Sequence, residues 1–192
     1  TGGIPDVEDY DWDNPQQDTE ALARYVASLK DMKLLWAPRA GHTYSNIGYE
    51  LLGRMLEVVE RRSLEDLIRD DILRPIGMTS STLFYPEADK SRLAMPYVPG
   101  PGGDLAAAPA WPYNRRHAAS STLVSSAGDM VRWLQVNLGD GSLGARRIVS
   151  AASARALRAP VALPPGDWIP KPFGRALGWF LAPTPAGTLV LH

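Results

Sequence analysis

The sequence predicts an α+β chain in which helices outnumber strands. Four or five segments carry apolar residues at helical spacing, and two segments near the end of the chain have strand character. The 192 residues, 45% of them apolar, are enough to bury a sizeable core. The last predicted strand runs to the final residue, and an open strand end makes a poor domain boundary. Residues 1–192 are therefore expected to be part of a larger domain.

The first helix is expected after an irregular N-terminal segment. Residues 1–17 contain Gly and Pro pairs that are typical of turns and favour a loop. Asp18 is a suitable N-cap, and apolar side chains recur behind it at helical spacing: Leu22, Tyr25, Val26 and Leu29. Pro38 and Gly41 end this unit.

The clearest helix begins at Ser45 or Asn46, either of which is a natural cap. Its apolar side chains form one stripe: Ile47, Leu51, Leu52, Met55, Leu56 and Val59. The stripe predicts the buried face, and the charged residues are expected to face the other way: Glu50, Arg54, Glu57 and Arg61.

Three further helices are predicted from caps and spacing. Ser63 and Ser126 each stand three residues ahead of an aspartate, as in a capping box. The first of these helices runs to Pro75. The second is predicted to stop at residues 139–141 and to bury Met130, Val131, Leu134 and Leu138. A shorter helix is expected over residues 150–158.

Strands are predicted in two places. Short strands are expected over residues 83–85 and 94–98, within a stretch rich in Pro and Gly. A clearer pair covers residues 178–181 and 188–191 and is joined by a Pro/Gly turn, which is typical of a hairpin.

Composition excludes several classes of protein. The net charge of −1 offers no electrostatic footprint for nucleic acid or anionic lipid. There is no cysteine, and the three histidines lack the spacing of a zinc site. No apolar run approaches the ~18 residues that a membrane span needs. Residues 139–144 fit a GxGxxG pattern but follow a helix, so we interpret them as a turn. We expect no metal, no cofactor, no nucleic-acid partner and no membrane span; oligomeric state is not predicted.

Two polar residues at the start of the clearest helix are candidates for chemistry. The hydroxyl of Tyr44 could relay a proton if cations lay nearby, and the carboxamide of Asn46 could both donate to and accept from an ester or amide group. The alternative is structural: Asn46 or Ser45 caps the helix, and Tyr44 packs on the entry loop.

The surrounding residues resemble a known family. Residues 41–53, which read Gly-His-Thr-Tyr-Ser-Asn-Ile-Gly-Tyr-Glu-Leu-Leu-Gly, are similar to the second motif of class C β-lactamases and related penicillin-binding proteins. Four other segments resemble motifs of that family, in the same order: residues 1–6, 73–78, 123–133 and 177–179. Since several matches in register are more specific than any one, the chain is identified as a member of this group of serine hydrolases.

The resemblance implies a fold and a mechanism. The fold would be β-lactamase/transpeptidase-like, with this segment supplying most of the helical subdomain and edge strands of the antiparallel sheet. A serine of a Ser-x-x-Lys motif would attack a carbonyl and form an acyl-serine intermediate. By carry-over, Tyr44 relays the proton, Asn46 orients the substrate, and His192 is the first residue of the third motif. The alternative for His192 is a histidine that merely ends a strand.

The chain departs from the family pattern twice. None of its four lysines follows a serine by three positions, so the nucleophile is not in this chain and is expected upstream of Thr1. Ser121 stands in a Ser-Ser-Thr segment where many relatives have Ala-Gly-Gly. Its hydroxyl could contact the substrate or merely cap a loop. We favour the loop and keep Ser121 as a candidate substrate-binding residue in the wall of the site.

The expected function is hydrolysis of an ester, amide, peptide or β-lactam by a serine hydrolase that takes a small-molecule or peptide substrate. The alternative is a non-catalytic relative that binds peptide or cell-wall fragments. A Ser-x-x-Lys motif encoded before Thr1 would favour the enzyme over the binder. Because such relatives are often exported, a periplasmic or secreted location is expected.

Overall fold

The computed structural model describes residues 2–7, 10–12, 14–100, 102–161 and 174–192. Its α-helices are α1 (Ala21–Ser28), α2 (Asn46–Glu60), α3 (Leu64–Ile68), α4 (Ala127–Leu138) and α5 (Ala151–Arg158). Its strands are β1 (Tyr97–Pro99), β2 (Leu105–Ala107), β3 (Ser142–Leu143), β4 (Arg146–Arg147), β5 (Gly174–Arg175), β6 (Phe180–Thr184) and β7 (Gly187–Leu191).

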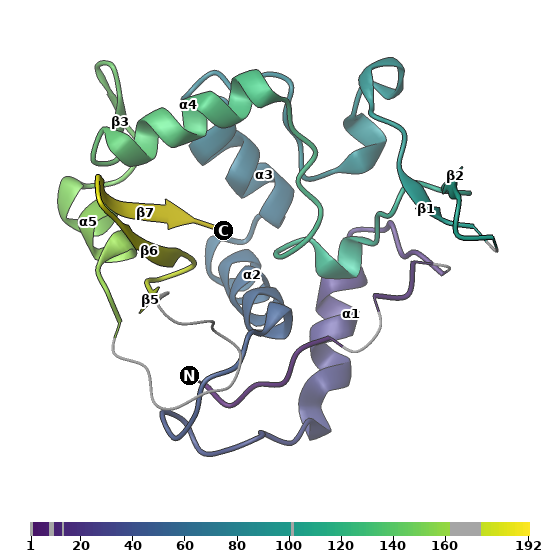
Figure 1. The fold of residues 1–192 in the computed structure, drawn as a ribbon. Helices are drawn as coiled ribbons and strands as arrows, with labels where there is room; N and C mark the ends of the chain where they lie inside the picture. The colour runs from purple at the N-terminus through teal and green to yellow at the C-terminus, as the bar shows by residue number, and fades with distance from the viewer. Residues whose placement is uncertain (1, 8–9, 13, 101, 162–173) are drawn as a thin grey trace.

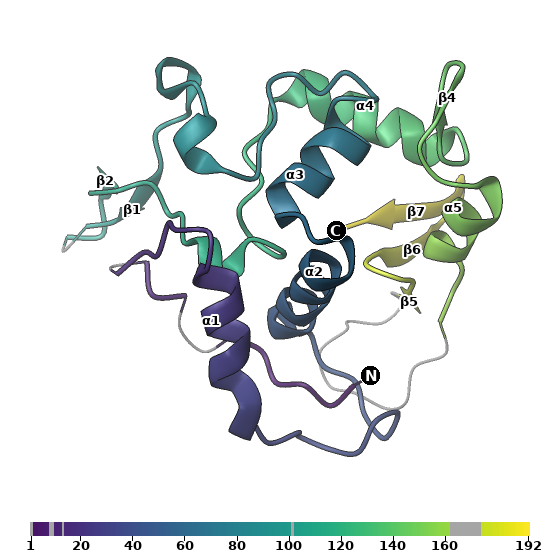
Figure 2. The same cartoon turned by 180° about the vertical axis from the view of Figure 1, so that it is seen from behind.

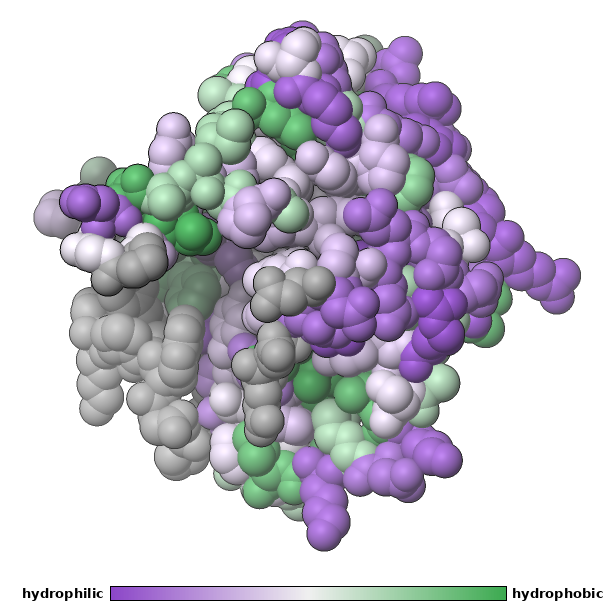
Figure 3. Space-filling model, turned by 90° about the vertical axis from the view of Figure 1, so that its right-hand side faces the viewer, coloured by the Kyte–Doolittle hydropathy of each residue, from purple (hydrophilic) through white to green (hydrophobic). Residues whose placement is uncertain are grey.

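The helices and the largest sheet occupy different parts of the molecule. The strands β5, β6 and β7 form an antiparallel sheet that lies beside α5, and α4 runs along the top (Figures 1 and 2). The hairpin β1–β2 projects at the opposite side of the molecule from this sheet. The face turned to the viewer in Figure 3 is mostly hydrophilic, and its hydrophobic residues form separate patches.

Four serine caps confirm the predicted helix starts. Each serine Oγ accepts a hydrogen bond from the backbone N–H three residues on: Ser45 at 3.1 Å, Ser63 at 3.1 Å, Ser126 at 3.2 Å and Ser150 at 3.0 Å. Each cap stabilises its helix by about 1 kcal/mol. Asp18 was expected to cap α1, but α1 begins later, and the Asp18 carboxylate instead accepts from the N–H of Glu20 at 3.0 Å.

The hairpin predicted at the end of the chain is confirmed. β6 and β7 pair antiparallel from Phe180 opposite Leu191 to Thr184 opposite Gly187. The short strand β5 adds to the other edge of β6, with Arg175 opposite Phe180. Two residues are too few for a period-two pattern, so β5 could not be predicted from the sequence.

The strands predicted earlier in the chain are largely wrong. β1 covers only the end of the stretch 94–98. The stretch 83–85 contains no strand. Thr82 forms an isolated bridge with Val124, and Tyr85–Glu87 is a 3₁₀ turn. Pro86 lacks an N–H group and has a fixed φ, which suits a turn better than a paired strand.

The core consists of two apolar clusters. One joins α1, α3, the loop after α3 and the 114–122 segment: Leu22, Leu64, Leu83 and Ala118. The other packs the end of the α3 segment on α4: Leu73, Ile76, Met78 and Val136.

Most of helix α2 is oriented opposite to the expectation. Of the six side chains predicted to be buried, Ile47 is buried as expected, but four are exposed, with relative exposures of 53%, 62%, 48% and 73% for Leu52, Met55, Leu56 and Val59. The rest of the buried face carries Asn46, Glu50, Gly53 and Glu57, again at helical spacing. A Cβ at Gly53 would lie 2.6 Å from the Cβ of Ala119, so this face is in close contact with the 114–122 segment. Polar partners on that segment, rather than apolar area, decide which face is buried.

Helix α4 shows the same departure. Val131, Leu134 and Leu138 are 52%, 49% and 82% exposed, whereas Asp129 and Val136 are buried. The Asp129 carboxylate accepts from the N–H of Ser80 at 2.8 Å and from Oγ of Ser81 at 2.7 Å. These bonds hold the polar residue inside.

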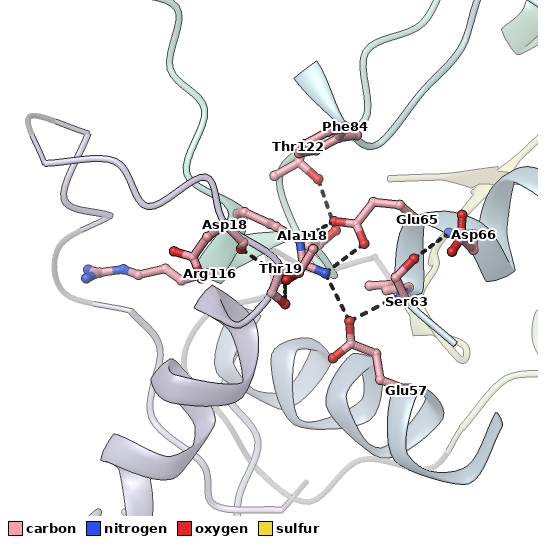
Figure 4. A network of polar contacts seen from close by, with 12 residues as sticks. Asp18, Thr19, Glu57, Ser63, Glu65, Asp66, Phe84, Arg116, Ala118 and Thr122 are labelled. Atoms are coloured by element: carbon pink, nitrogen blue, oxygen red, sulfur yellow. Dashed lines mark hydrogen bonds and ion pairs between the residues drawn. The ribbon is translucent and has the colours of Figure 1, made fainter. Parts of the chain in front are cut away.

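A buried ionic cluster joins α2, α3 and the 114–122 segment. In Figure 4, the side chains of Glu57 and Glu65 point toward a common centre. Both carboxylates accept hydrogen bonds from the guanidinium of Arg115. Arg115 is 1% exposed, and its Nη2 lies 2.8 Å from Oε2 of Glu65 and 3.2 Å from Oε1 of Glu57. Its Nη1 donates to the carbonyl of Thr19 ahead of α1. One cation therefore fixes the relative positions of three elements.

Candidate active site

A cavity of about 350 Å³ lies where the start of α2 meets the β5–β6 turn. Its walls come from four segments and three single residues: residues 2–4, 42–45, 48–49 and 175–179, with Leu52, Val161 and His192. The cavity thus joins the N-terminal segment, the cap of α2 and the end of β7, which are far apart in the sequence.

Tyr44 and His192 meet at this cavity. The Oη of Tyr44 lies 3.2 Å from Nε2 of His192, and their ring centroids are 6.1 Å apart. The cap of α2 positions the phenol, and β7 delivers the imidazole. The structure therefore brings together two of the residues that the sequence singled out, although 148 positions separate them.

The β5–β6 turn determines the tautomer of His192. Its Nδ1 lies 2.8 Å from the carbonyl oxygen of Gly178. A carbonyl oxygen can only accept, so Nδ1 carries a hydrogen and donates it. In the neutral ring Nε2 is then the acceptor, and it faces the hydroxyl of Tyr44.

Gly178 has the conformation that this contact requires. Its φ is +78°, a region that L side chains rarely adopt, and a Cβ there would lie 3.1 Å from Oη of Tyr49. Only glycine fits the turn without displacing either the carbonyl or Tyr49.

Asn46 and Ser121 lie outside this cavity. Asn46 is 9% exposed, and its Nδ2 donates to Oη of Tyr10 at 2.5 Å. Its backbone N–H donates to Oδ1 of Asp6 at 2.7 Å. Ser121 is exposed and lines a second, largely apolar hollow of about 270 Å³ between α3 and α4. The structure therefore does not place either residue beside the Tyr44–His192 pair.

The whole chain, residues 1–192, matches the family model described as Beta-lactamase. The chain belongs to the beta-lactamase family. It is 33% identical over 164 residues to penicillin-binding protein 4 of Amycolatopsis lactamdurans, which covers 84% of this chain and 43% of that protein. It is also 33% identical over 109 residues to the D-alanyl-D-alanine-carboxypeptidase/endopeptidase AmpH of Escherichia coli K12, covering 56% of this chain and 26% of AmpH. The chain thus spans less than half the length of these relatives.

Solved structures confirm the predicted β-lactamase/transpeptidase fold. The octameric penicillin-binding protein homologue from Pyrococcus abyssi matches with a TM-score of 0.79 and 27% identity, over 98% of this chain and 43% of that one. A D-amino acid amidase from Ochrobactrum anthropi matches with a TM-score of 0.74 and 19% identity, over all of this chain and 53% of that one. The latter likeness concerns the fold alone.

The sequence interpretation of this beta-lactamase-family chain missed Arg175. This residue lines the cavity, is 8% exposed, and stacks on the ring of Phe180 with its guanidinium carbon 3.6 Å from the centroid. Burial lowers the pKa of Arg175, while the phenols of Tyr44 and Tyr49 oppose that shift. An arginine remains charged at neutral pH and places a positive charge in the cavity wall. The sequence did contain a signal for Arg175. It is a charged residue just ahead of Leu177-Gly178-Trp179, a segment that resembles a family motif.

Neither a membrane-spanning helix nor a metal-binding cluster is present among the described residues. No helix among them is long and apolar enough to cross a membrane. No three His, Cys, Asp or Glu side chains among them are arranged to hold a metal ion.

Proposed function

We propose that the full-length protein is a serine hydrolase that forms an acyl-serine intermediate on an ester, amide, peptide or β-lactam substrate. The observation that carries this proposal is the hydrogen-bonded row from Tyr44 through His192 to the carbonyl of Gly178, at the wall of a cavity. Membership of the beta-lactamase family supports it. The nucleophile is assigned to a Ser-x-x-Lys motif outside residues 1–192, because these residues contain none.

Tyr44 and His192 provide a route for the proton of the attacking serine. As the serine Oγ bonds to the carbonyl carbon, its proton passes to Oη of Tyr44, and the proton of Tyr44 moves to Nε2 of His192. The imidazolium keeps its Nδ1–H bond to Gly178. Return of the proton through Tyr44 to the leaving group breaks the scissile bond and leaves the acyl-serine, and water then repeats the sequence. Asn46 is proposed to orient the substrate, and Ser121 is proposed as a substrate contact.

The test uses the full-length protein with a chromogenic short-chain ester and a chromogenic cephalosporin. Turnover of either substrate, together with an added acyl mass on the rapidly quenched protein, is the expected result. Binding of labelled penicillin or cell-wall peptide without turnover or acyl mass would contradict this proposal. That outcome would instead support a non-catalytic binding protein.

Gly178→Ala tests the fixed tautomer of His192. The left-handed backbone would be strained by about 1–2 kcal/mol, and the new methyl group would press on Oη of Tyr49. The displaced carbonyl would release Nδ1, so we expect kcat/KM for the better substrate to fall by about tenfold or more.

Gly144→Ala is the matched control for this change. Gly144 also has a positive φ, +57°, but a Cβ there would meet no atom within 4 Å, and the residue lies outside the cavity. We expect a similar loss of thermal stability with unchanged kcat/KM. Equal activity losses in the two variants would contradict a specific role for the Gly178 carbonyl.

A further inference from the structure

Residues 3–7 form an N-terminal segment that is bonded to both ends of the loop ahead of α2. At the first end, the carbonyl of Gly3 accepts a hydrogen bond from the N–H of Leu35 at 2.7 Å. At the second end, Oγ of Ser45 donates to the carbonyl of Pro5 at 2.8 Å. In both views the purple N-terminal segment passes close to the start of α2 (Figures 1 and 2). The segment therefore holds the loop on the body of the molecule.

Asp6 extends this contact to the helix itself. Its Oδ1 accepts from the backbone N–H of Asn46, the first residue of α2, at 2.7 Å, and also from the N–H of Val7 at 2.8 Å. The N–H groups in the first turn of a helix have no partner within the helix. Oγ of Ser45 satisfies another of them, that of Gly48, at 3.1 Å. A carboxylate also interacts favourably with the positive end of the helix dipole. The start of α2 thus has two caps, and one of them comes from a residue 40 positions upstream.

Tyr44 lies directly ahead of these two caps. The bonds at Ser45 and Asn46 fix the peptide units that follow Tyr44, and therefore the direction in which its phenol leaves the chain. The proposed proton transfer needs Oη of Tyr44 within hydrogen-bond reach of Nε2 of His192, which is 3.2 Å away. His192 follows β7, a different element. Fraying of the first turn of α2 would consequently move one partner and leave the other in place.

We infer that Asp6 is a positioning residue for this proton transfer, because it clamps the first N–H of α2 and so keeps the hydroxyl of Tyr44 beside Nε2 of His192. Asp6 is not among the residues that line the cavity, so we assign it no contact with the substrate. The inference rests on the proposed function, in which Tyr44 relays the proton of the serine.

The first test removes the clamp from the full-length protein. In Asp6→Ala we expect kcat for the better substrate to fall by about tenfold or more, with KM changed by about twofold or less. Asp6→Asn keeps an oxygen that can accept from Asn46, and it should stay within about threefold of the wild type. Asp6→Glu keeps the charge but carries it one methylene further, so it should lose kcat as Asp6→Ala does. Unchanged kcat in both Asp6→Ala and Asp6→Glu would overturn the inference.

A double-mutant cycle separates positioning from general support of the fold. Tyr44→Phe has no hydroxyl to position, so adding Asp6→Ala to it should lower kcat by about twofold or less. A purely structural role would multiply the two losses instead. Equal fold-losses from Asp6→Ala in the two backgrounds would therefore also overturn the inference.

Asp129→Ala is the matched control. The Asp129 carboxylate likewise clamps a distant segment, since its Oδ2 accepts from the N–H of Ser80, 49 positions away. Asp129 is more deeply buried than Asp6, and it lies on α4, outside the cavity. We expect at least as large a loss of thermal stability with unchanged kcat/KM. A loss of kcat equal to that of Asp6→Ala would show a general effect of destabilisation and would contradict the role of Asp6.

A last measurement does not depend on turnover. In the full-length protein labelled with ¹⁵N-histidine, the ring signals missing from a His192→Gln variant belong to His192. Its Nε2 signal should shift in the same direction in Asp6→Ala and Tyr44→Phe, because both changes take the hydroxyl away from Nε2, and it should stay in place in Asp129→Ala. If the wild type turns over neither test substrate, the proposed function fails, whereas an unshifted Nε2 signal in Asp6→Ala means that the inference fails.

Discussion

Tyr44→Phe is expected to lower kcat/KM of the full-length protein by about 10²–10⁴-fold, the usual loss when a positioned proton-transfer group is removed. The substitution deletes only the hydroxyl that lies 3.2 Å from Nε2 of His192. Without it, the imidazole cannot reach the serine proton by the proposed route. The loss should appear mainly in kcat, because the phenyl ring keeps the wall of the cavity intact.

Tyr49→Phe provides the comparison for this prediction. Tyr49 lines the same cavity, and its Oη faces Gly178 rather than the imidazole. Its loss should be much smaller than that of Tyr44→Phe. Unchanged turnover in Tyr44→Phe, or equal losses in both variants, would remove the role given to Tyr44.

Arg115→Ala is expected to destabilise the protein by about 3–5 kcal/mol, because it leaves two carboxylates in the interior without their cation. Glu57 and Glu65 have side chains only 6% and 11% exposed, so water cannot replace the guanidinium easily. The bond from Arg115 to the carbonyl of Thr19 is lost as well. The free energy of unfolding in urea, with the midpoint and slope both fitted, measures the effect.

Arg24→Ala is the matched control for Arg115→Ala, because it removes an arginine from an ion pair that is exposed rather than buried. Arg24 pairs with Asp18 at 2.7 Å, and both side chains are 53% exposed. A solvent-exposed pair contributes only about 0–1 kcal/mol. If Arg115→Ala cost no more than Arg24→Ala, the buried cluster would not be a structural centre of the protein.

Local signals in the sequence predicted four helix starts and the final hairpin, but not the strands expected over residues 83–85 and 94–98. Serine caps are set by residues three positions apart, and all four predicted serine starts are confirmed. The final hairpin is confirmed for the same reason, since its turn and both strands are adjacent in the chain. The burial of α2 could not be predicted in this way. Its deciding partners, Arg115 and Ala119, lie more than 50 residues away.

The candidate site was predictable only in part. The motif around Tyr44 and the family resemblance pointed to Tyr44 and His192, and the fold brings them together. The contribution of Gly178 depends on a left-handed turn. Such a turn leaves no periodic or spacing signal in the sequence. The separation of Asn46 and Ser121 from the cavity likewise depends on how the 114–122 segment packs on α2.

The bond between His192 and the main chain restricts how this histidine can be modified. Nδ1 is occupied by the carbonyl of Gly178, so an alkylating or acylating reagent would reach the ring only through Nε2. A group attached there would take the position of the Tyr44 hydroxyl, 3.2 Å away. Covalent labelling of this imidazole and retention of its contact with the phenol are therefore mutually exclusive.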